Sequence, residues 1–113
     1  MNIEKIEKNG FVCAVVRGDE TVITDSQSAF NLLMTVKYDI GTKNIAISKK
    51  LMKEDFFVLS SGLAGDILQK YINYGDYSHY TSKPLHDFIY ESNKGRDVFF
   101  AATEDEAIEC LCR

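Results

Sequence analysis

The sequence predicts an α/β fold in which a single-layer mixed β-sheet is flanked by helices. Three observations support this fold class: a hairpin signal near the start, apolar segments of strand length, and amphipathic helical segments that alternate with them. The chain has 113 residues, and we expect residues 1–113 to form a single α/β domain. A domain of this length buries roughly two-thirds of the surface that its unfolded chain exposes, so its stability requires neither a metal nor a disulfide.

The first expected element is a β-hairpin. Residues 3–6 and 11–16 flank Asn9-Gly10, a turn pair in which both residues accept positive φ. Residues 11–16 (FVCAVV) are apolar throughout, which is typical of an inner strand covered on both faces. Residues 21–24 either extend a strand or cross to the other side of the sheet.

A helix is expected next, followed by a short strand. Asp25 or Ser26 caps the helix, and Gly41 ends it. Its apolar stripe consists of Ala29, Leu32, Leu33 and Val36. Residues 44–48 (NIAIS) then predict a short buried strand.

The segment between residues 55 and 74 admits two interpretations. Residues 55–60 (DFFVLS) could form a strand that leads to a helix opening at Ser61, or one helix could run from about Asp55 to Tyr74. Apolar residues recur there at three- and four-residue steps, which fits a helix better than a strand: Phe56, Leu59, Leu63, Ile67 and Tyr71. We therefore predict a single helix.

The remaining sequence predicts a helix, a strand and a last helix. Ser82 caps the first helix, Pro84 lies in its first turn, where the missing N–H is tolerated, and Gly95 ends it. Residues 98–101 form an apolar strand. Residues 103–106 (TEDE) are a capping box that opens a short terminal helix.

Composition excludes several functional classes. The net charge is −4 and the 13 basic residues are scattered, whereas nucleic-acid binding requires a cationic surface. The longest apolar run, residues 11–16, is far shorter than the ~20 residues that cross a bilayer. The first ten residues lack the apolar core of a signal peptide. We therefore expect a cytoplasmic protein with neither a nucleic-acid nor a membrane partner.

The three cysteines fit that location. Cys13 lies inside an apolar run, where a small core residue is the simplest interpretation. Cys110 and Cys112 form a C-x-C pair without further ligands at metal-binding spacing. We expect one of this pair to be buried and the other exposed, and we predict no disulfide.

Four blocks of sequence carry a resemblance to a known family. They are VITDSQSAFNLLMTVKY (22–38), EDFFVLSSGLAGDILQKYINY (54–74), GDYSHYTSKPLHDFIYESNKG (75–95) and DVFFAATEDEAIECL (97–111). Over nearly its whole length the chain resembles a bacterial family catalogued as domain of unknown function 4180. The resemblance implies no activity, because none is assigned to that family.

The chain is more distantly similar to STAS-like domains, the anti-sigma-factor antagonists of bacteria. In these domains a strand leads to a D-S-S-G-L motif that opens a helix, and the second serine is a phosphorylation switch. Residues 60–63 (SSGL) match this motif, whereas Leu59 replaces the aspartate. The resemblance implies that Ser61 is the switch, and phosphate at a helix N-terminus is electrostatically favourable. The predicted single helix instead makes Ser61 a small residue on a packed helix, which is the interpretation we favour.

One departure from both patterns concerns a central strand. In both families an apolar strand separates the helix that here ends near Tyr74 from the loop beginning at Gly75. Residues 72–75 (INYG) run directly into residues 76–80 (DYSHY), so a strand of about five or six residues has no room after that helix. We therefore expect one central strand to be absent between Tyr74 and Asp76, either through a gap in the sequence, which we favour, or because a second subunit supplies it.

The candidate site is the loop and helix between residues 75 and 95. Ligands of α/β folds bind in loops that follow sheet strands, and a helix N-terminus can hold an anion. The expected ligand or partner surface consists of Asp76, Tyr77, Ser78, His79, Tyr80, Ser82, Lys83, Asp87, Tyr90 and Glu91.

Each chemical interpretation of this surface has a simpler alternative. Ser82 and Lys83 could act as nucleophile and base, but Ser82 is also a helix cap. His79 and His86 could bind a metal only if their imidazoles converged, and two solvent-facing histidines explain them more simply. The chain contains no G-x-S-x-G, P-loop or G-x-G-x-x-G motif. We therefore predict no catalytic residue, metal or cofactor, and we do not favour an enzyme.

Two functional hypotheses follow. The first is a small regulatory or protein-interaction module of STAS-like type, which binds a protein partner or self-associates as a homodimer. Tyr77, Tyr80 and Tyr90 favour it, because tyrosines are common interface anchors. The alternative is a small-molecule-binding or catalytic domain that uses the face from Asp76 to Glu91. A pocket beside Asp76 and Lys83 would favour this alternative, and a flat surface would favour the first hypothesis.

Overall fold

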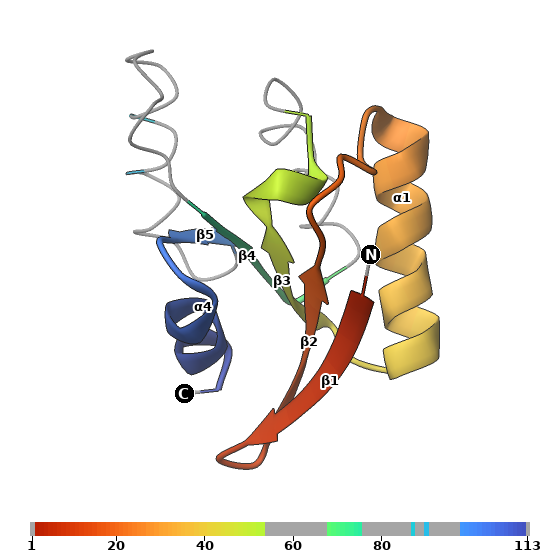
Figure 1. The fold of residues 1–113 in the computed structure, drawn as a ribbon. Helices are drawn as coiled ribbons and strands as arrows, with labels where there is room; N and C mark the ends of the chain where they lie inside the picture. Colours follow the sequence, from red (N-terminus) through yellow and green to blue (C-terminus); the bar gives the residue numbers. More distant parts are fainter. Residues whose placement is uncertain (1, 54–67, 76–86, 88–89, 91–97, 113) are drawn as a thin grey trace.

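The computed structural model describes residues 2–53, 68–75, 87, 90 and 98–112. Within these residues, five strands form one sheet whose spatial order follows their order along the chain. The strands are β1 (Asn2–Lys8), β2 (Phe11–Arg17), β3 (Asn44–Ser48), β4 (Lys70–Tyr74) and β5 (Val98–Ala101). β1 is antiparallel to β2, and β2 to β5 run parallel to one another (Figure 1). The predicted α/β fold with a mixed sheet is confirmed.

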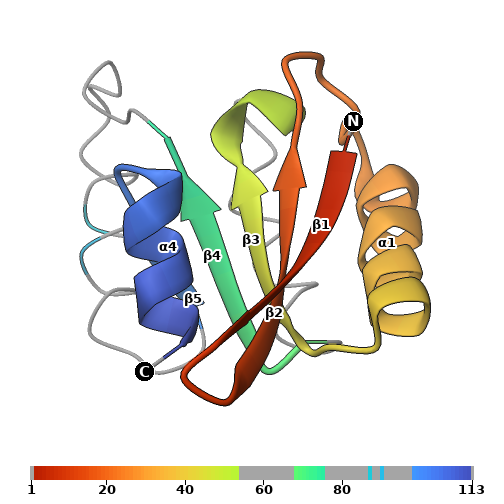
Figure 2. The ribbon, with the colours of Figure 1, turned by 60° about the horizontal axis from the view of Figure 1, so that its bottom comes forward.

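Two α-helices lie on opposite faces of this sheet. Figure 2 shows α1 (Ser26–Thr35) beside one face and α4 (Glu104–Leu111) beside the other. Side chains alternate between the faces of a strand, so neighbouring residues of β2 belong to different cores. Ala14 and Val16 pack in the core with α1, whereas Cys13 and Val15 pack in the core with α4. β2 is therefore an inner strand covered on both faces, as its apolar sequence predicts.

The hairpin between β1 and β2 forms at the predicted turn. Asn9 and Gly10 both adopt positive φ, at 54° and 81°, and Lys8 pairs with Phe11 across the turn. Only glycine and a few residues such as asparagine adopt this conformation at low cost, so the Asn-Gly pair specifies the register of the hairpin.

The helical segment that starts with α1 begins and ends where the sequence predicts. The Asp25 carboxylate accepts a hydrogen bond from the Ser28 N–H (2.8 Å), and the Ser28 hydroxyl accepts one from the Asp25 N–H (3.1 Å). These reciprocal bonds satisfy two backbone donors that a helix N-terminus leaves unpaired. α1 continues into a π-helical turn, Val36–Ile40, and Gly41 ends it with φ at 78°.

β4 corrects two predictions. Lys70–Tyr74 is a strand that pairs in parallel with both β3 and β5, so a single helix from Asp55 to Tyr74 is wrong over those residues. The central strand expected to be absent between Tyr74 and Asp76 is also accounted for, because β4 occupies that place in the sheet and ends directly before Gly75. The remainder of the predicted helix, residues 55–67, lies outside the described residues.

Buried polar groups explain why β4 does not look like a strand in sequence. Tyr71 recurs at helical spacing after Ile67, and Asn73 interrupts the apolar run. Both side chains are fully buried, and the Asn73 amide donates to the Tyr71 hydroxyl (3.2 Å) and to the Met52 sulfur (3.0 Å). An asparagine is stable in a core when its hydrogen bonds are satisfied, and this condition cannot be read from residue type alone.

The predictions for the last strand and helix, and for residues 21–24 after β2, can be compared with the structure in the same way. β5 and α4 form as expected, and Thr103 caps α4 by accepting a bond from the Glu106 N–H (3.2 Å). The Glu106 carboxylate accepts from the Ala102 N–H (3.2 Å) instead of from the Thr103 N–H that a capping box uses. Of residues 21–24, only Ile23 pairs as a bridge, with Met52.

No helix in the described part of the chain has both the length and the apolar character needed to cross a bilayer.

The three cysteines are free thiols. The predicted burial of Cys13 and of one cysteine of the C-x-C pair is confirmed, whereas the predicted exposure of the other is not. Cys13 is fully buried in the core beside α4. Of the C-x-C pair, Cys112 is buried and Cys110 is half-buried instead of exposed. Among the described residues, no three His, Cys, Asp or Glu side chains gather closely enough to hold a metal ion.

Candidate functional site

A pocket lies at the carboxyl ends of the parallel strands. We call it the edge pocket; its volume is about 420 Å³. It is lined by Arg17, Gly18, Asp19, Ser48, Lys49, Lys50, Tyr74, Gly75, Ala102, Thr103 and Glu104. These residues are the last residues of β2, β3 and β4, the turns that follow them, and the connection from β5 into α4. Open α/β sheets bind ligands outside the carboxyl ends of their strands, so the edge pocket has the position expected of a binding site.

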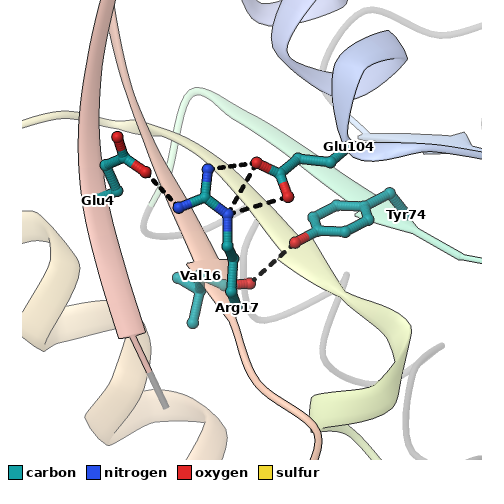
Figure 3. Close-up of polar contacts among 5 residues, drawn as sticks. All are labelled: Glu4, Val16, Arg17, Tyr74 and Glu104. Carbon is teal, nitrogen blue, oxygen red and sulfur yellow. Dashed lines mark hydrogen bonds and ion pairs between the residues drawn. The ribbon is translucent and has the colours of Figure 1, made fainter.

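Arg17 is the central charged group of this pocket. Its Nε donates to both carboxylate oxygens of Glu104, at 2.8 and 3.0 Å, and its terminal nitrogens donate to Glu104 and Glu4 (Figure 3). Hydrogen bonds to Glu104, and then to Glu4, raise the pKa of Arg17 above its usual range. One guanidinium thus links β1, β2 and α4, and two carboxylates surround its charge.

Tyr74 forms part of the wall beside Arg17. Its hydroxyl donates to the carbonyl oxygen of Val16 (3.3 Å), and its side chain is buried (Figure 3). Burial, and next the negative charge of Glu104, raise the pKa of Tyr74 to about 12. The phenol therefore stays protonated at neutral pH and acts as a fixed neutral donor.

Two lysines bring further positive charge to the lining. Lys50 forms an ion pair with Asp19 at 3.7 Å, and both side chains are exposed. The stem of Lys49 lies against Gly75, where an added Cβ would be 2.6 Å from the Lys49 Cβ. Because Gly75 has no side chain, the side chain of Lys49 can lie against it in the pocket lining.

The charges of the lining do not cancel. Three lining residues are cationic (Arg17, Lys49 and Lys50) and two are anionic (Asp19 and Glu104), so the lining has a formal charge of three minus two, or +1. The whole chain carries −4. Glu4 lies outside the lining but also bonds Arg17, so with Glu4 the sum is three minus three, or zero. The edge pocket therefore gathers three cationic side chains and is less negative than the chain as a whole.

The described residues include only part of the site predicted from the sequence. Of the ten expected surface residues, Asp87 and Tyr90 are described; both have helical backbone and are exposed. The other eight, which are Asp76, Tyr77, Ser78, His79, Tyr80, Ser82, Lys83 and Glu91, lie outside the described residues, and so does Ser61. Asp76 directly follows Gly75, which lines the edge pocket, so the predicted loop begins at its rim.

Sequence reasoning missed the lining residues themselves. Arg17, Ser48 and Tyr74 are the last residues of three strands, where polar side chains follow or end an apolar run. That signal is present in the sequence for Arg17 and Ser48. It could not be used at Tyr74, because residues 70–74 were predicted to be helical.

Comparison with known proteins agrees with the first of the two sequence resemblances. The family model described as Domain of unknown function (DUF4180) matches residues 8–111. No curated protein and no solved structure matches the chain.

Proposed function

We propose that this chain, which belongs to the family described as domain of unknown function DUF4180, binds a small molecule with one anionic group in the edge pocket. The observation that carries this proposal is the pocket at the carboxyl ends of β2, β3 and β4, with three cationic side chains in its lining. Its volume of about 420 Å³ lies within the roughly 300–1,000 Å³ of small-molecule sites.

The distribution of charge supports a ligand with a single carboxylate or phosphate. Lys49 and Lys50 belong to the lining, where their charges attract an anion. The first turn of α4 carries Glu104, which lines the pocket, and Asp105 and Glu106 next to it, and these carboxylates repel a second negative charge. A hydroxyl or amino group on the same ligand would find partners in the side chains of Ser48 and Thr103 at the pocket lining.

The test is an NMR titration of the full chain with inorganic phosphate and, separately, with glutamate. We expect amide shifts to change at residues 48–50, 75 and 102–104, with a dissociation constant on the order of 1 mM for phosphate. Lys49→Ala should weaken binding. Lys53→Ala is the matched control, since Lys53 is an exposed lysine outside the lining, and it should bind like the wild type. Changes spread over many surface lysines, or equal binding by Lys49→Ala, would reject the proposal.

A second candidate is a regulatory module of STAS-like type with Ser61 as a phosphorylation switch. What supports it is β4, because this strand removes the departure that counted most strongly against the resemblance. A helix that carries Ser61 cannot continue through Lys70–Tyr74, which also weakens the interpretation of Ser61 as the middle of one long helix. Tyr90, which has helical backbone and an exposed side chain, supports a protein partner or a homodimer.

Native mass spectrometry of protein purified from its host tests the second candidate. A covalent phosphoryl group that is absent from Ser61→Ala would support the regulatory role. A stable complex with a second chain would also support it. An unmodified monomer under growth and stress conditions would contradict it. A retained small ligand of one anionic group would instead support the edge-pocket proposal.

A further inference from the structure

Two cysteine thiols meet at the end of the molecule away from the edge pocket. Cys13 lies on β2, and Cys112 follows the last residue of α4. Their sulfur atoms are 3.9 Å apart, and the two residues are 0% and 1% exposed. They are 99 positions apart in the sequence, so the fold alone brings them together.

We propose that Cys13 and Cys112 form a reversible intramolecular disulfide when the protein meets a small-molecule disulfide oxidant such as oxidised glutathione. This inference is independent of the proposed ligand. In the reduced protein, the two thiols pack as small core residues between β2 and α4.

The local geometry favours closure of the pair. A disulfide has a sulfur–sulfur distance of ~2.05 Å, so the sulfurs must approach by roughly 2 Å. Cys13 is held in an inner strand, but Cys112 lies at the helix end, where its N–H is shared between the carbonyls of Ile108 (3.0 Å) and Glu109 (3.3 Å). The Asn9 amide donates to the Cys112 carbonyl (3.2 Å) and keeps this residue over the hairpin. We therefore expect Cys112 at the helix end, and not Cys13 in the inner strand, to make most of this movement.

The reaction balances as two thiol–disulfide exchanges. Opening of the last turn of α4 exposes Cys112, whose thiolate attacks one sulfur of oxidised glutathione and releases one glutathione thiolate. When the turn closes again, the Cys13 thiolate attacks the Cys112 sulfur of the mixed disulfide and releases the second glutathione. The two protein thiols lose two electrons and two protons, and one glutathione disulfide becomes two glutathione thiols.

The second exchange is slow at neutral pH. Burial, and next the neighbouring Cys112, raise the pKa of the Cys13 thiol to about 12. Only the thiolate attacks, so its fraction rises about tenfold per pH unit below that pKa. We expect oxidation to be slow at pH 7 and markedly faster at pH 9.

The test is oxidation of the full chain with oxidised glutathione at pH 9, followed by alkylation and mass spectrometry. The wild type should lose the mass of two hydrogen atoms and yield a peptide linked through Cys13 and Cys112. The linked loop spans nearly the whole domain, so the thermal midpoint should rise on the order of 10 °C and return after reduction.

Variants identify the residues involved. Cys110→Ala, the control, should form the link like the wild type, whereas Cys112→Ala should not. Cys13→Ala should accumulate a stable glutathione adduct on Cys112. A Cys110–Cys112 link, an adduct that persists in the wild type, or a lower thermal midpoint after oxidation would overturn the proposal.

Discussion

At the scale of single residues, Arg17 decides how much positive charge the edge pocket offers. Its guanidinium is bound by Glu104 and Glu4, so much of its charge is already balanced inside the protein. The side chains of Arg17 and Glu104 are 34% and 28% exposed, and solvent therefore screens their attraction only in part. Glu104 is in effect a competitor of any anionic ligand for Arg17.

This competition gives a prediction for Glu104→Gln. Removal of the carboxylate charge frees Arg17 and raises the formal charge of the lining, so phosphate should bind about three- to fivefold more tightly, or ~1 kcal/mol. NMR titration at low salt measures the change. Glu7→Gln is the control, since Glu7 is exposed on β1 outside the pocket lining, and it should leave the affinity unchanged. Equal or weaker binding by Glu104→Gln would show that Glu104 does not compete.

At the scale of elements, local hydrogen bonds explain which predictions succeeded. The Asn9-Gly10 turn, the Asp25 cap and the Thr103 cap each depend on a few neighbouring residues. Such signals are complete within the sequence segment that forms the element, so the hairpin, α1 and α4 could be predicted. β4 could not, because its stability depends on partners far along the chain, including Met52 and the flanking strands.

The cap of α1 makes stability depend on pH. The Ser28 N–H and hydroxyl stabilise the Asp25 carboxylate and lower its pKa. Because the folded pKa is lower than the unfolded one, this stabilisation is present above the unfolded pKa, near 4, and is lost as the pH falls through the folded pKa.

Two substitutions separate the charge of Asp25 from its hydrogen bond. Asp25→Asn keeps a side-chain acceptor but cannot ionise, so it should stay folded at pH 7 and show a smaller loss of thermal midpoint between pH 5 and pH 2. Asp25→Ala loses the acceptor as well and should have a lower midpoint already at pH 7. Thermal unfolding by circular dichroism across this pH range measures both effects. An unchanged acid dependence in Asp25→Asn would contradict the role of the cap.

At the scale of the whole molecule, the edge pocket exists because parallel strands end together. Its lining comes from residues 17–19, 48–50, 74–75 and 102–104, four short segments with no common sequence motif. The sequence predicted the fold class and a site in the loop and helix of residues 75–95. It could not place the lining, because that requires knowing that β4 lies between β3 and β5. The predicted site loop nevertheless starts directly after Gly75, at the rim of this pocket.

The most direct test of the central claim is the dissociation constant of inorganic phosphate for the wild type and for Gly75→Ala, measured side by side by NMR. An added Cβ at position 75 would lie 2.6 Å from the Lys49 Cβ, so it must displace the lysine stem from the pocket wall. We expect roughly fivefold weaker binding by this variant, whose spectrum should remain that of a folded protein. The same affinity in both proteins would contradict the assignment of the edge pocket as the binding site.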